Sequence, residues 1–217
     1  MDRRIVLGTL ILSAILISTF FYIHTWHSKE SRDNVPSQLM GQVSISLPKP
    51  RYDGGISIEE ALLRRRSIRD YAAGSLTLQE LSQLLWAAQG ITGSGGLRTA
   101  PSAGALYPLE VYVVVGDVEG LGMGVYKYRP QEHSIQKVVE GDCRSELAGA
   151  ALGQSCVERA AIDVVITAVY ERTTEKYGEW GVRYVHIEVG HAAQNLCLQA
   201  AALDLGQSQS APSTTAG

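Results

Sequence analysis

The sequence predicts an α+β fold in which helices surround a mainly antiparallel β-sheet. Residues 161–171 (AIDVVITAVYE) form an almost continuous apolar run, which is typical of a strand covered on both faces. Residues 124–130 and 133–141 have the pattern of a β-hairpin, and residues 109–117 predict a further strand. Apolar residues recur at helical spacing through residues 181–206, so a long helix is expected to pack against this sheet.

The N-terminal region predicts a membrane anchor. Residues 5–23 carry no charge, and at about 1.5 Å per residue a helix of this length just crosses the hydrocarbon core of a bilayer. Arg3 and Arg4 precede the apolar run, so the N-terminus is expected to stay in the cytoplasm with the bulk of the chain outside. We therefore assign residues 1–26 to an anchor, and a cleaved signal peptide that leads to secretion is the alternative.

Composition divides the rest of the chain into three parts. Residues 27–56 are polar and rich in Ser, Pro and Gly, as expected of a linker. Residues 57–206 carry the regular patterns and form the compact domain. Residues 207–217 are small and polar without periodicity, so they are predicted to be a disordered tail.

The overall charge argues against one class of partner. The 217 residues have a formal net charge of -3, and 19% of them are charged. A broad surface for binding nucleic acid needs a basic face, so nucleic acid is not an expected partner. A local anion site remains compatible with this charge.

Two helices of the compact domain are expected to begin at capping boxes. Ser57 is followed three residues later by Glu60, and Thr77 is followed at the same spacing by Glu80. The apolar spacing after Ser57 predicts a helix of about three turns, which would carry into an arginine-rich segment.

The arginine-rich segment is LLRRRSIRDY, residues 62–71. If the helix continues, Arg65 and Arg69 share a face, with the hydroxyl of Ser67 between them. Two guanidinium groups and a hydroxyl suit a phosphate. The alternative is a solvated basic helix end that complements the helix dipole.

Residues 91–108 contain too many glycines and prolines for regular structure and predict a long loop. Pro101, Gly104 and Pro108 make its second half compact. The small side chains at residues 102–105 would let the backbone approach a flat ligand closely. A tight loop that merely leads into the next strand is the alternative interpretation.

Lys176 and Tyr177 lie just before the long helix. They are candidates for proton donors or acceptors if they are buried, and ordinary surface groups otherwise.

No metal site is predicted. The three cysteines, Cys143, Cys156 and Cys197, are far apart and are best interpreted as small buried side chains. His186 and His191 are not at metal-ligand spacing from each other.

Three segments in this order resemble the nitroreductase-like flavoproteins: RRSIRDY at 65–71, PSAGALYPLEVYVVV at 101–115, and the long segment at 176–206 that begins KYGEW. The similarity is greatest to the branch typified by azoline oxidases of peptide-natural-product pathways, the SagB or thiazole-oxidase type. It covers about residues 57–206 and implies a nitroreductase-like α+β fold. It also implies FMN, bound without a covalent link at the interface of a homodimer.

The resemblance also implies which residues form the site. The FMN phosphate and ribityl chain are expected at Arg65, Arg66, Ser67 and Arg69, and the isoalloxazine at Pro101, Ser102, Ala103 and Gly104. Lys176 and Tyr177 match a Lys-Tyr pair that lies near the substrate in azoline oxidases. There the pair would remove a ring proton while the flavin accepts hydride.

The function implied is an FMN-dependent oxidoreductase acting on a small molecule or on a heterocycle in a peptide. The enzymatic alternative is an NAD(P)H-dependent nitro or quinone reductase. In that family the chain continues well past the long helix, whereas QSQSAPSTTAG follows Gly206 here. The comparison therefore implies a C-terminally truncated member, and a non-catalytic flavin-binding or partner-binding protein is the second alternative.

Overall fold

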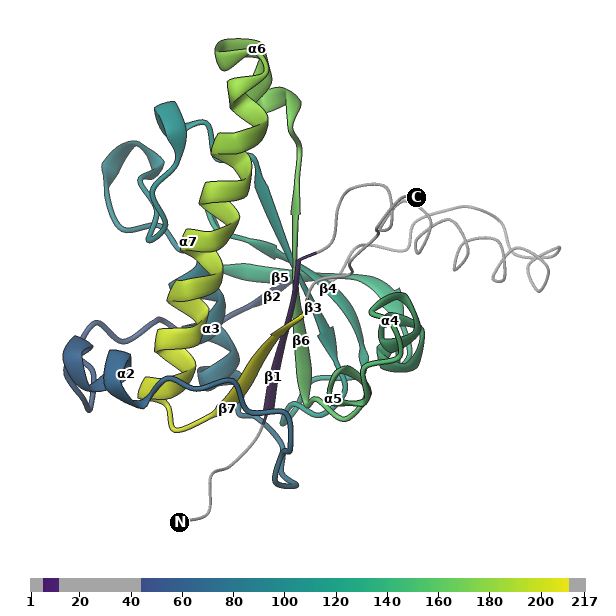
Figure 1. Cartoon of the computed structure of the whole chain (residues 1–217). Coiled ribbons are helices and arrows are strands. Elements are labelled where there is room, and N and C mark those ends of the chain that lie inside the picture. Colours follow the sequence, from purple (N-terminus) through teal and green to yellow (C-terminus); the bar gives the residue numbers. More distant parts are fainter. Residues whose placement is uncertain (1–5, 12–43, 211–217) are drawn as a thin grey trace, which may run out of the picture.

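The fold is built on one seven-stranded sheet, seen in a computed structural model that describes residues 6–11 and 44–210 (Figure 1). In order across the sheet the strands are β2 (Ser44–Ser46), β5 (Ser134–Glu140), β4 (Gly124–Arg129), β3 (Leu109–Val115), β6 (Ile162–Ala168), β1 (Val6–Ile11) and β7 (Gly206–Ser210). The first five pair antiparallel, and β1 pairs parallel with β6 and β7. The predicted mainly antiparallel α+β fold is confirmed.

Helices cover both faces of this sheet. The long helix α7 (Trp180–Ala202) and α3 (Leu78–Gln89) lie on one face, and α4 (Arg144–Ala150) and α5 (Ser155–Glu158) lie on the other (Figure 1). The central strands alternate between two cores because successive side chains of a strand point to opposite faces. Val113 packs in the core beneath α3 and α7, and its neighbour Val114 packs in the core beneath α4 and α5.

Two shorter helices flank α7 at its ends. α2 (Ile58–Arg64) lies beside the C-terminal end of α7, and α6 (Glu171–Tyr177) leads into its N-terminal end (Figure 1). The side chain of Ser57 caps α2 by accepting the Glu60 N–H, and Thr77 and Glu80 form a complete capping box on α3. Both predicted helix starts are therefore confirmed.

α2 is shorter than expected, because it ends at Arg64 rather than continuing through the arginines. The following residues leave the helix to pair with strand β7. The Ile68 N–H donates to the carbonyl of Gln207 at 2.7 Å, and Ser67 forms a parallel bridge with Gln207. The helix therefore does not continue, and the condition under which Arg65 and Arg69 would share a helical face is not met.

The N-terminal prediction needs a correction. Residues 6–11 form strand β1 between β6 and β7, not the start of a membrane helix. Short apolar runs fit a buried strand as well as a helix, and periodicity alone cannot separate the two. Within residues 6–11 and 44–210, no helix is both long and apolar enough to cross a membrane. Residues 1–5 and 12–26 of the predicted anchor lie outside the described residues.

The predicted linker and tail also differ from the structure where it describes them. Residues 44–46 form β2, and the Arg51 N–H donates to the side chain of Gln83 at 2.8 Å, so this part of the linker packs on the domain. Residues 207–210 belong to β7 rather than to a disordered tail. Strand pairing uses the backbone, so small polar side chains do not prevent it. Residues 211–217 lie outside the described residues.

Candidate active site

The loop at residues 101–108 is held in a conformation that few residues adopt freely. The φ angle is positive at Gly104 (62°), Ala105 (54°) and Tyr107 (47°). Positive φ costs energy for residues other than glycine and persists where the surroundings enforce it. The Ser102 hydroxyl supports this conformation by accepting the Tyr107 N–H at 2.9 Å. Because strained backbone concentrates at functional sites, the ligand-binding interpretation of this loop is favoured over a simple connection.

Gly104 faces the tips of the Lys-Tyr pair. A Cβ atom built on Gly104 would lie 2.8 Å from the hydroxyl of Tyr177 and 3.0 Å from Nζ of Lys176. Both residues sit in the last turn of α6, which ends before Gly178. The structure therefore brings together Gly104, Lys176 and Tyr177, three predicted site residues from two distant parts of the sequence.

Aromatic packing fixes the Tyr177 ring. It meets the Tyr184 ring edge to face, with centroids 5.2 Å apart, and Lys176 Nζ lies 5.4 Å from the Tyr177 ring centroid. Lys176 is exposed and Tyr177 is half-buried. The pair therefore presents an amine and a phenol, both able to exchange protons, beside an open stretch of backbone that a ligand can reach.

A buried carboxyl group lies against the loop, and the sequence analysis did not single it out. Glu188 of α7 is 2% exposed, and one of its oxygens has no hydrogen-bond partner. Burial raises the pKa of Glu188 to about 7, against the hydrogen bond from Ser102 and the charge of Arg98. Glu188 lies between Val185 and Val189 in the buried stripe of α7. An acidic residue at an apolar position of this pattern could have indicated a buried functional carboxylate.

Arg98 links this carboxyl group to the end of the loop. Its guanidinium lies 4.5 Å from the centroid of the Tyr107 ring and donates to the side chain of Gln89 at 2.8 Å. Burial lowers the pKa of Arg98, while the charges of Glu188 and Tyr107 act in the opposite direction. Arg98 was also absent from the predicted site, although it lies in the same glycine-rich loop.

The arginine segment forms a separate site. Arg65 and Arg66 line a cavity of about 240 Å³ together with Cys197, Asp204 and Gln207. The Arg66 guanidinium donates to the backbone carbonyls of Leu63 (3.0 Å) and Arg65 (2.7 Å), so it also serves the helix end as the alternative interpretation expected.

Ser67 and Arg69 do not line this cavity. Ile68 lies near Gly206, where a Cβ atom would be 3.4 Å from its methyl group. Because side chains alternate along an extended segment, the neighbours Ser67 and Arg69 lie on the other side, where both are exposed. Only part of the predicted phosphate site is therefore assembled around one cavity.

The two predicted halves of the site lie at opposite ends of α7. The arginine cavity includes Ala201, near the C-terminal end, whereas Ser102 contacts Glu188. At 1.5 Å per residue these two contacts are about 20 Å apart along the helix axis. Figure 1 shows the same separation, with α2 beside the lower end of α7 and α6 at the upper end. A single chain does not bring residues 101–104 to residues 65–69.

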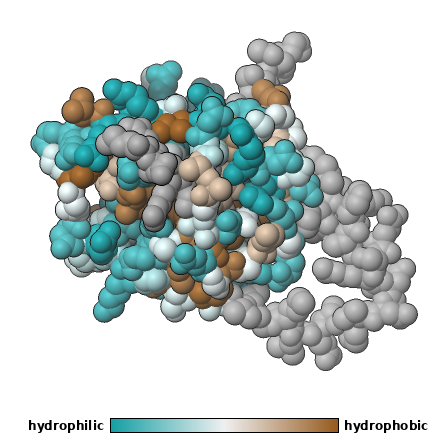
Figure 2. Space-filling model, turned by 90° about the horizontal axis from the view of Figure 1, so that it is seen from below, coloured by the Kyte–Doolittle hydropathy of each residue, from teal (hydrophilic) through white to brown (hydrophobic). Residues whose placement is uncertain are grey.

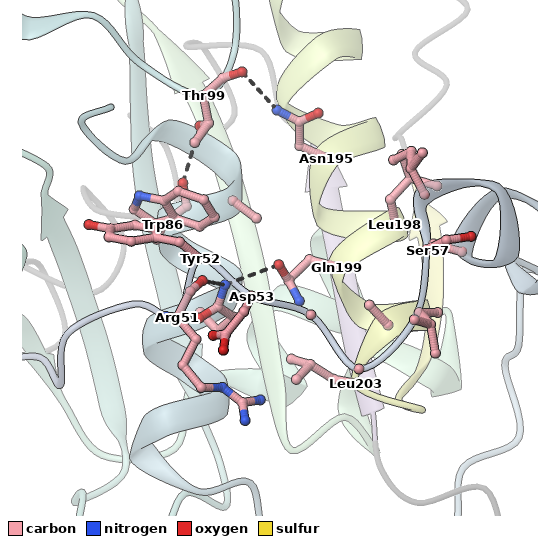
Figure 3. Close-up of a pocket in the computed structure, with 18 residues that line it drawn as sticks. Arg51, Tyr52, Asp53, Ser57, Trp86, Thr99, Asn195, Leu198, Gln199 and Leu203 are labelled. Carbon is pink, nitrogen blue, oxygen red and sulfur yellow. Dashed lines mark hydrogen bonds between the residues drawn. The ribbon is translucent and has the colours of Figure 1, made fainter. Parts of the chain in front are cut away.

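A further cavity of about 340 Å³ lies along the C-terminal half of α7, next to α2 (Figure 3). Residues 51–58 cover it, and the Tyr52 ring lies over Trp86 with centroids 5.5 Å apart. At one side the Asn195 amide donates to the carbonyl of Thr99 at 3.3 Å. The lining mixes aromatic, aliphatic and amide groups, which suits a flat organic ligand. The sequence analysis did not predict this cavity.

Comparison with known proteins identifies the family. The Nitroreductase family model matches residues 62–211, so this chain belongs to the nitroreductase family. It is 53% identical over 151 residues to a Methanocaldococcus jannaschii protein named "Putative nitroreductase MJ1384", covering 70% of this chain and 76% of that protein. A crystal structure with the same description, from Ralstonia eutropha JMP134, superposes with a TM-score of 0.64 at 32% identity, covering 77% of this chain and 76% of that one.

A third relative has a different name. The trifolitoxin-processing protein TfxB of Rhizobium leguminosarum bv. trifolii is 30% identical over 123 residues, which cover 54% of this chain and 33% of that protein. The resemblance to nitroreductase-like proteins inferred from the three sequence segments is thereby confirmed, as is the nitroreductase-like fold.

Proposed function

We propose that this chain is an FMN-dependent oxidoreductase of the SagB-type branch of the nitroreductase family. The observation that carries the proposal is the approach of Lys176 and Tyr177 to Gly104. A glycine at this position leaves room for an amine and a phenol beside the loop that would contact the flavin. Reduction of a nitro group or a quinone requires hydride and protons, whereas oxidation of an azoline ring requires a base that removes a ring proton.

The residues present fit a flavin mononucleotide. Arg65 and Arg66 provide charge-assisted donors for a phosphate at one end of α7. Gly104 offers an open backbone for close approach of a flat ring at the other end. When bound, FMN supplies a two-electron acceptor for hydride.

The chain's own groups would handle the proton. Removal of a ring proton from the substrate requires a base within hydrogen-bond reach, and Lys176 Nζ and the Tyr177 hydroxyl are the candidates. The Tyr184 ring and the end of α6 hold Tyr177 in place. Loop residues 101–105, fixed by Ser102, would exclude water from one side of the ligand.

A second copy of the chain would complete the site. Because the arginine cavity and the loop lie at opposite ends of α7, two chains packed antiparallel would place the arginines of one beside the loop of the other. Exposed apolar side chains on α2 support such packing, since Ile58, Leu62 and Leu63 are 58%, 53% and 73% exposed. On the face shown in Figure 2, apolar side chains lie among polar ones.

The similarity to TfxB supports a peptide substrate, because that protein is named for processing trifolitoxin. The similarity to MJ1384 supports the alternative, an NAD(P)H-dependent nitro or quinone reductase. This chain spans about a third of TfxB, so a peptide substrate belongs to the proposal alone.

Replacement of Lys176 by Ala separates the two activities. The proposal predicts that K176A abolishes oxidation of an azoline-containing peptide but leaves reduction of the bound flavin by NADPH unchanged. Lys49→Ala, at an exposed lysine, is the matched control and should change neither rate. Equal loss of both activities in K176A would contradict a role in proton abstraction.

A further inference from the structure

A second polar cavity lies behind the active-site loop, at the ends of β3, β4 and β5. It has a volume of about 680 Å³, within the range of roughly 300–1,000 Å³ typical of small-molecule sites. Leu106 and Tyr107, which follow the loop directly, form part of its wall. Three arginines line it: Arg98, Arg129 and Arg172.

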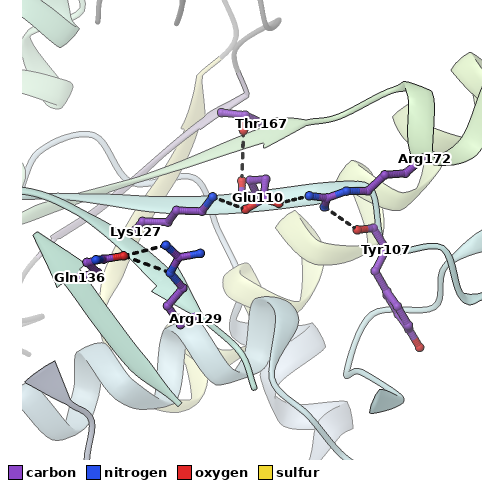
Figure 4. A network of polar contacts seen from close by, with 7 residues as sticks. All are labelled: Tyr107, Glu110, Lys127, Arg129, Gln136, Thr167 and Arg172. Atoms are coloured by element: carbon purple, nitrogen blue, oxygen red, sulfur yellow. Dashed lines mark hydrogen bonds and ion pairs between the residues drawn. The ribbon is translucent and has the colours of Figure 1, made fainter. Parts of the chain in front are cut away.

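One carboxylate in this cavity is already neutralised by two cations. Glu110 pairs with Lys127 at 2.7 Å and with Arg172 at 2.6 Å, and Arg172 also donates to the carbonyl of Tyr107 at 3.2 Å (Figure 4). Burial disfavours the charge on Glu110, but the hydrogen bonds from Lys127 and Arg172 outweigh it and lower its pKa. Glu110 is therefore ionised, and its charge is used within this network.

The other two arginines donate to neutral acceptors, while Glu188 also acts on Arg98 through its charge. Arg129 donates to the amide oxygen of Gln136 (2.6 Å) and Arg98 to the amide oxygen of Gln89 (2.8 Å), both neutral acceptors. Neither forms a salt bridge with a carboxylate within the described ranges, and the exposed Glu132 at the rim is the other acidic residue of the lining.

Two buried donors in the same place have no acceptor. Gln89 is completely buried, and its amide nitrogen has no hydrogen-bond partner. The Arg98 Nε is also buried without a partner. A buried donor without an acceptor costs about 1–3 kcal/mol, more when it is charged, so two of them beside one cavity indicate a missing acceptor.

The geometry points to a binding site for an organic anion, whose carboxylate or phosphate group would accept hydrogen bonds from Arg98 and Gln89 while Arg129 balances its charge. Oxyanions of this kind match the planar donors of a guanidinium. The volume leaves room for an organic body behind the charged group. This site shares no residue with the arginine segment at 65–69, so it is separate from the proposed flavin phosphate site.

Isothermal titration calorimetry of the complete chain tests this inference. The probes are succinate for a carboxylate and inorganic phosphate for a phosphate, each at ionic strength held constant with NaCl. For at least one probe we expect a saturable site that is separate from any phosphate held by the arginine segment, and the probe that binds there identifies the chemical group. Arg98→Gln and Arg129→Gln should each weaken that binding by roughly tenfold or more, because each removes a charged donor.

Two controls keep the result interpretable. Arg65→Gln alters the flavin phosphate segment and should leave the affinity unchanged. Arg129 lies at the exposed rim, so R129Q tests the site even if R98Q fails to fold. The inference is overturned if neither probe binds saturably, if R129Q and a folded R98Q bind as the unmodified chain does, or if R65Q alone abolishes binding.

Discussion

The backbone of Gly104 approaches the hydroxyl of Tyr177 so closely that a Cβ atom at residue 104 would lie 2.8 Å from it. Gly104 also has a φ of 62°, which glycine adopts without strain. Contact and backbone conformation therefore both require glycine here. Both features place the loop against the Lys-Tyr pair, so a substitution at residue 104 tests the site directly.

Replacement of Gly104 by Ala should displace the tips of Lys176 and Tyr177. Both are ends of flexible side chains, so the fold should survive, at a cost of about 1–2 kcal/mol for the positive φ. We expect substrate oxidation to fall at least about tenfold, with a melting temperature lowered by a few degrees. Steady-state kinetics and a thermal melt measure the two effects separately.

Gly149→Ala is the matched control for this substitution. Gly149 lies within α4, and a Cβ atom there would meet nothing within 4 Å. Alanine is the better helix former, so this change should stabilise the chain by about 0.5–1 kcal/mol and leave activity unchanged. Unchanged activity in G104A would show that the approach of Gly104 to Tyr177 has no functional role.

Mixed pairs of damaged chains should recover flavin binding if two copies share each site. One copy would carry Arg65→Ala with Arg66→Ala, and the other Gly104→Trp, which blocks the loop. Neither variant alone should bind FMN, because each of its sites lacks one half. A purified mixed pair should hold about half the flavin of the unmodified protein, as measured by visible absorbance. Recovery would fail if one chain formed the whole site.

Replacement of Glu188 by Gln should remove a pH dependence of stability. The pKa of Glu188 is raised from 4.5 to about 7 by burial, so the folded chain binds a proton that the unfolded chain has released over this range. Stability of the unmodified chain therefore falls as pH rises from about 4.5 to about 7. The advantage of E188Q in unfolding free energy should grow by on the order of 3 kcal/mol across this window.

Urea unfolding at several pH values measures this difference. Glu175→Gln, at an exposed position of α6, is the matched control. Asp163 is also buried with a raised pKa. Because it is present in both chains, its contribution to the pH dependence of stability cancels in the comparison. If the difference in unfolding free energy between E188Q and the unmodified chain does not change with pH, the raised pKa assigned to Glu188 is contradicted.

Local patterns in the sequence predicted the central part of the fold well. The capping pair Thr77 and Glu80 and the apolar run at 161–171 each predicted the element that the structure contains. The edges of the sheet were not predictable in this way. The strand at residues 206–210 depends on backbone pairing with residues 6–11, and nothing in QSQS indicates that partner. The location of the chain remains a prediction, because most of residues 5–23 lies outside the described residues.

The sequence predicted several residues of the candidate site but not that they lie close together. The sequence identified Gly104, Lys176 and Tyr177 separately, and only the fold shows that they meet. Glu188 and Arg98 were missed because their importance arises from burial, which depends on how α7 packs beneath the loop. The helix end at Arg64 depended on pairing with a distant strand, which helical spacing alone could not reveal.

Flavin binding is the sharpest test of the proposed function. The complete chain would be incubated with FMN and desalted, and its visible absorption spectrum would be recorded beside that of a variant carrying Arg65→Ala and Arg66→Ala. We expect flavin bands near one equivalent per chain for the unmodified protein and little or none for the variant. A colourless unmodified protein, or equal flavin in both, would contradict it.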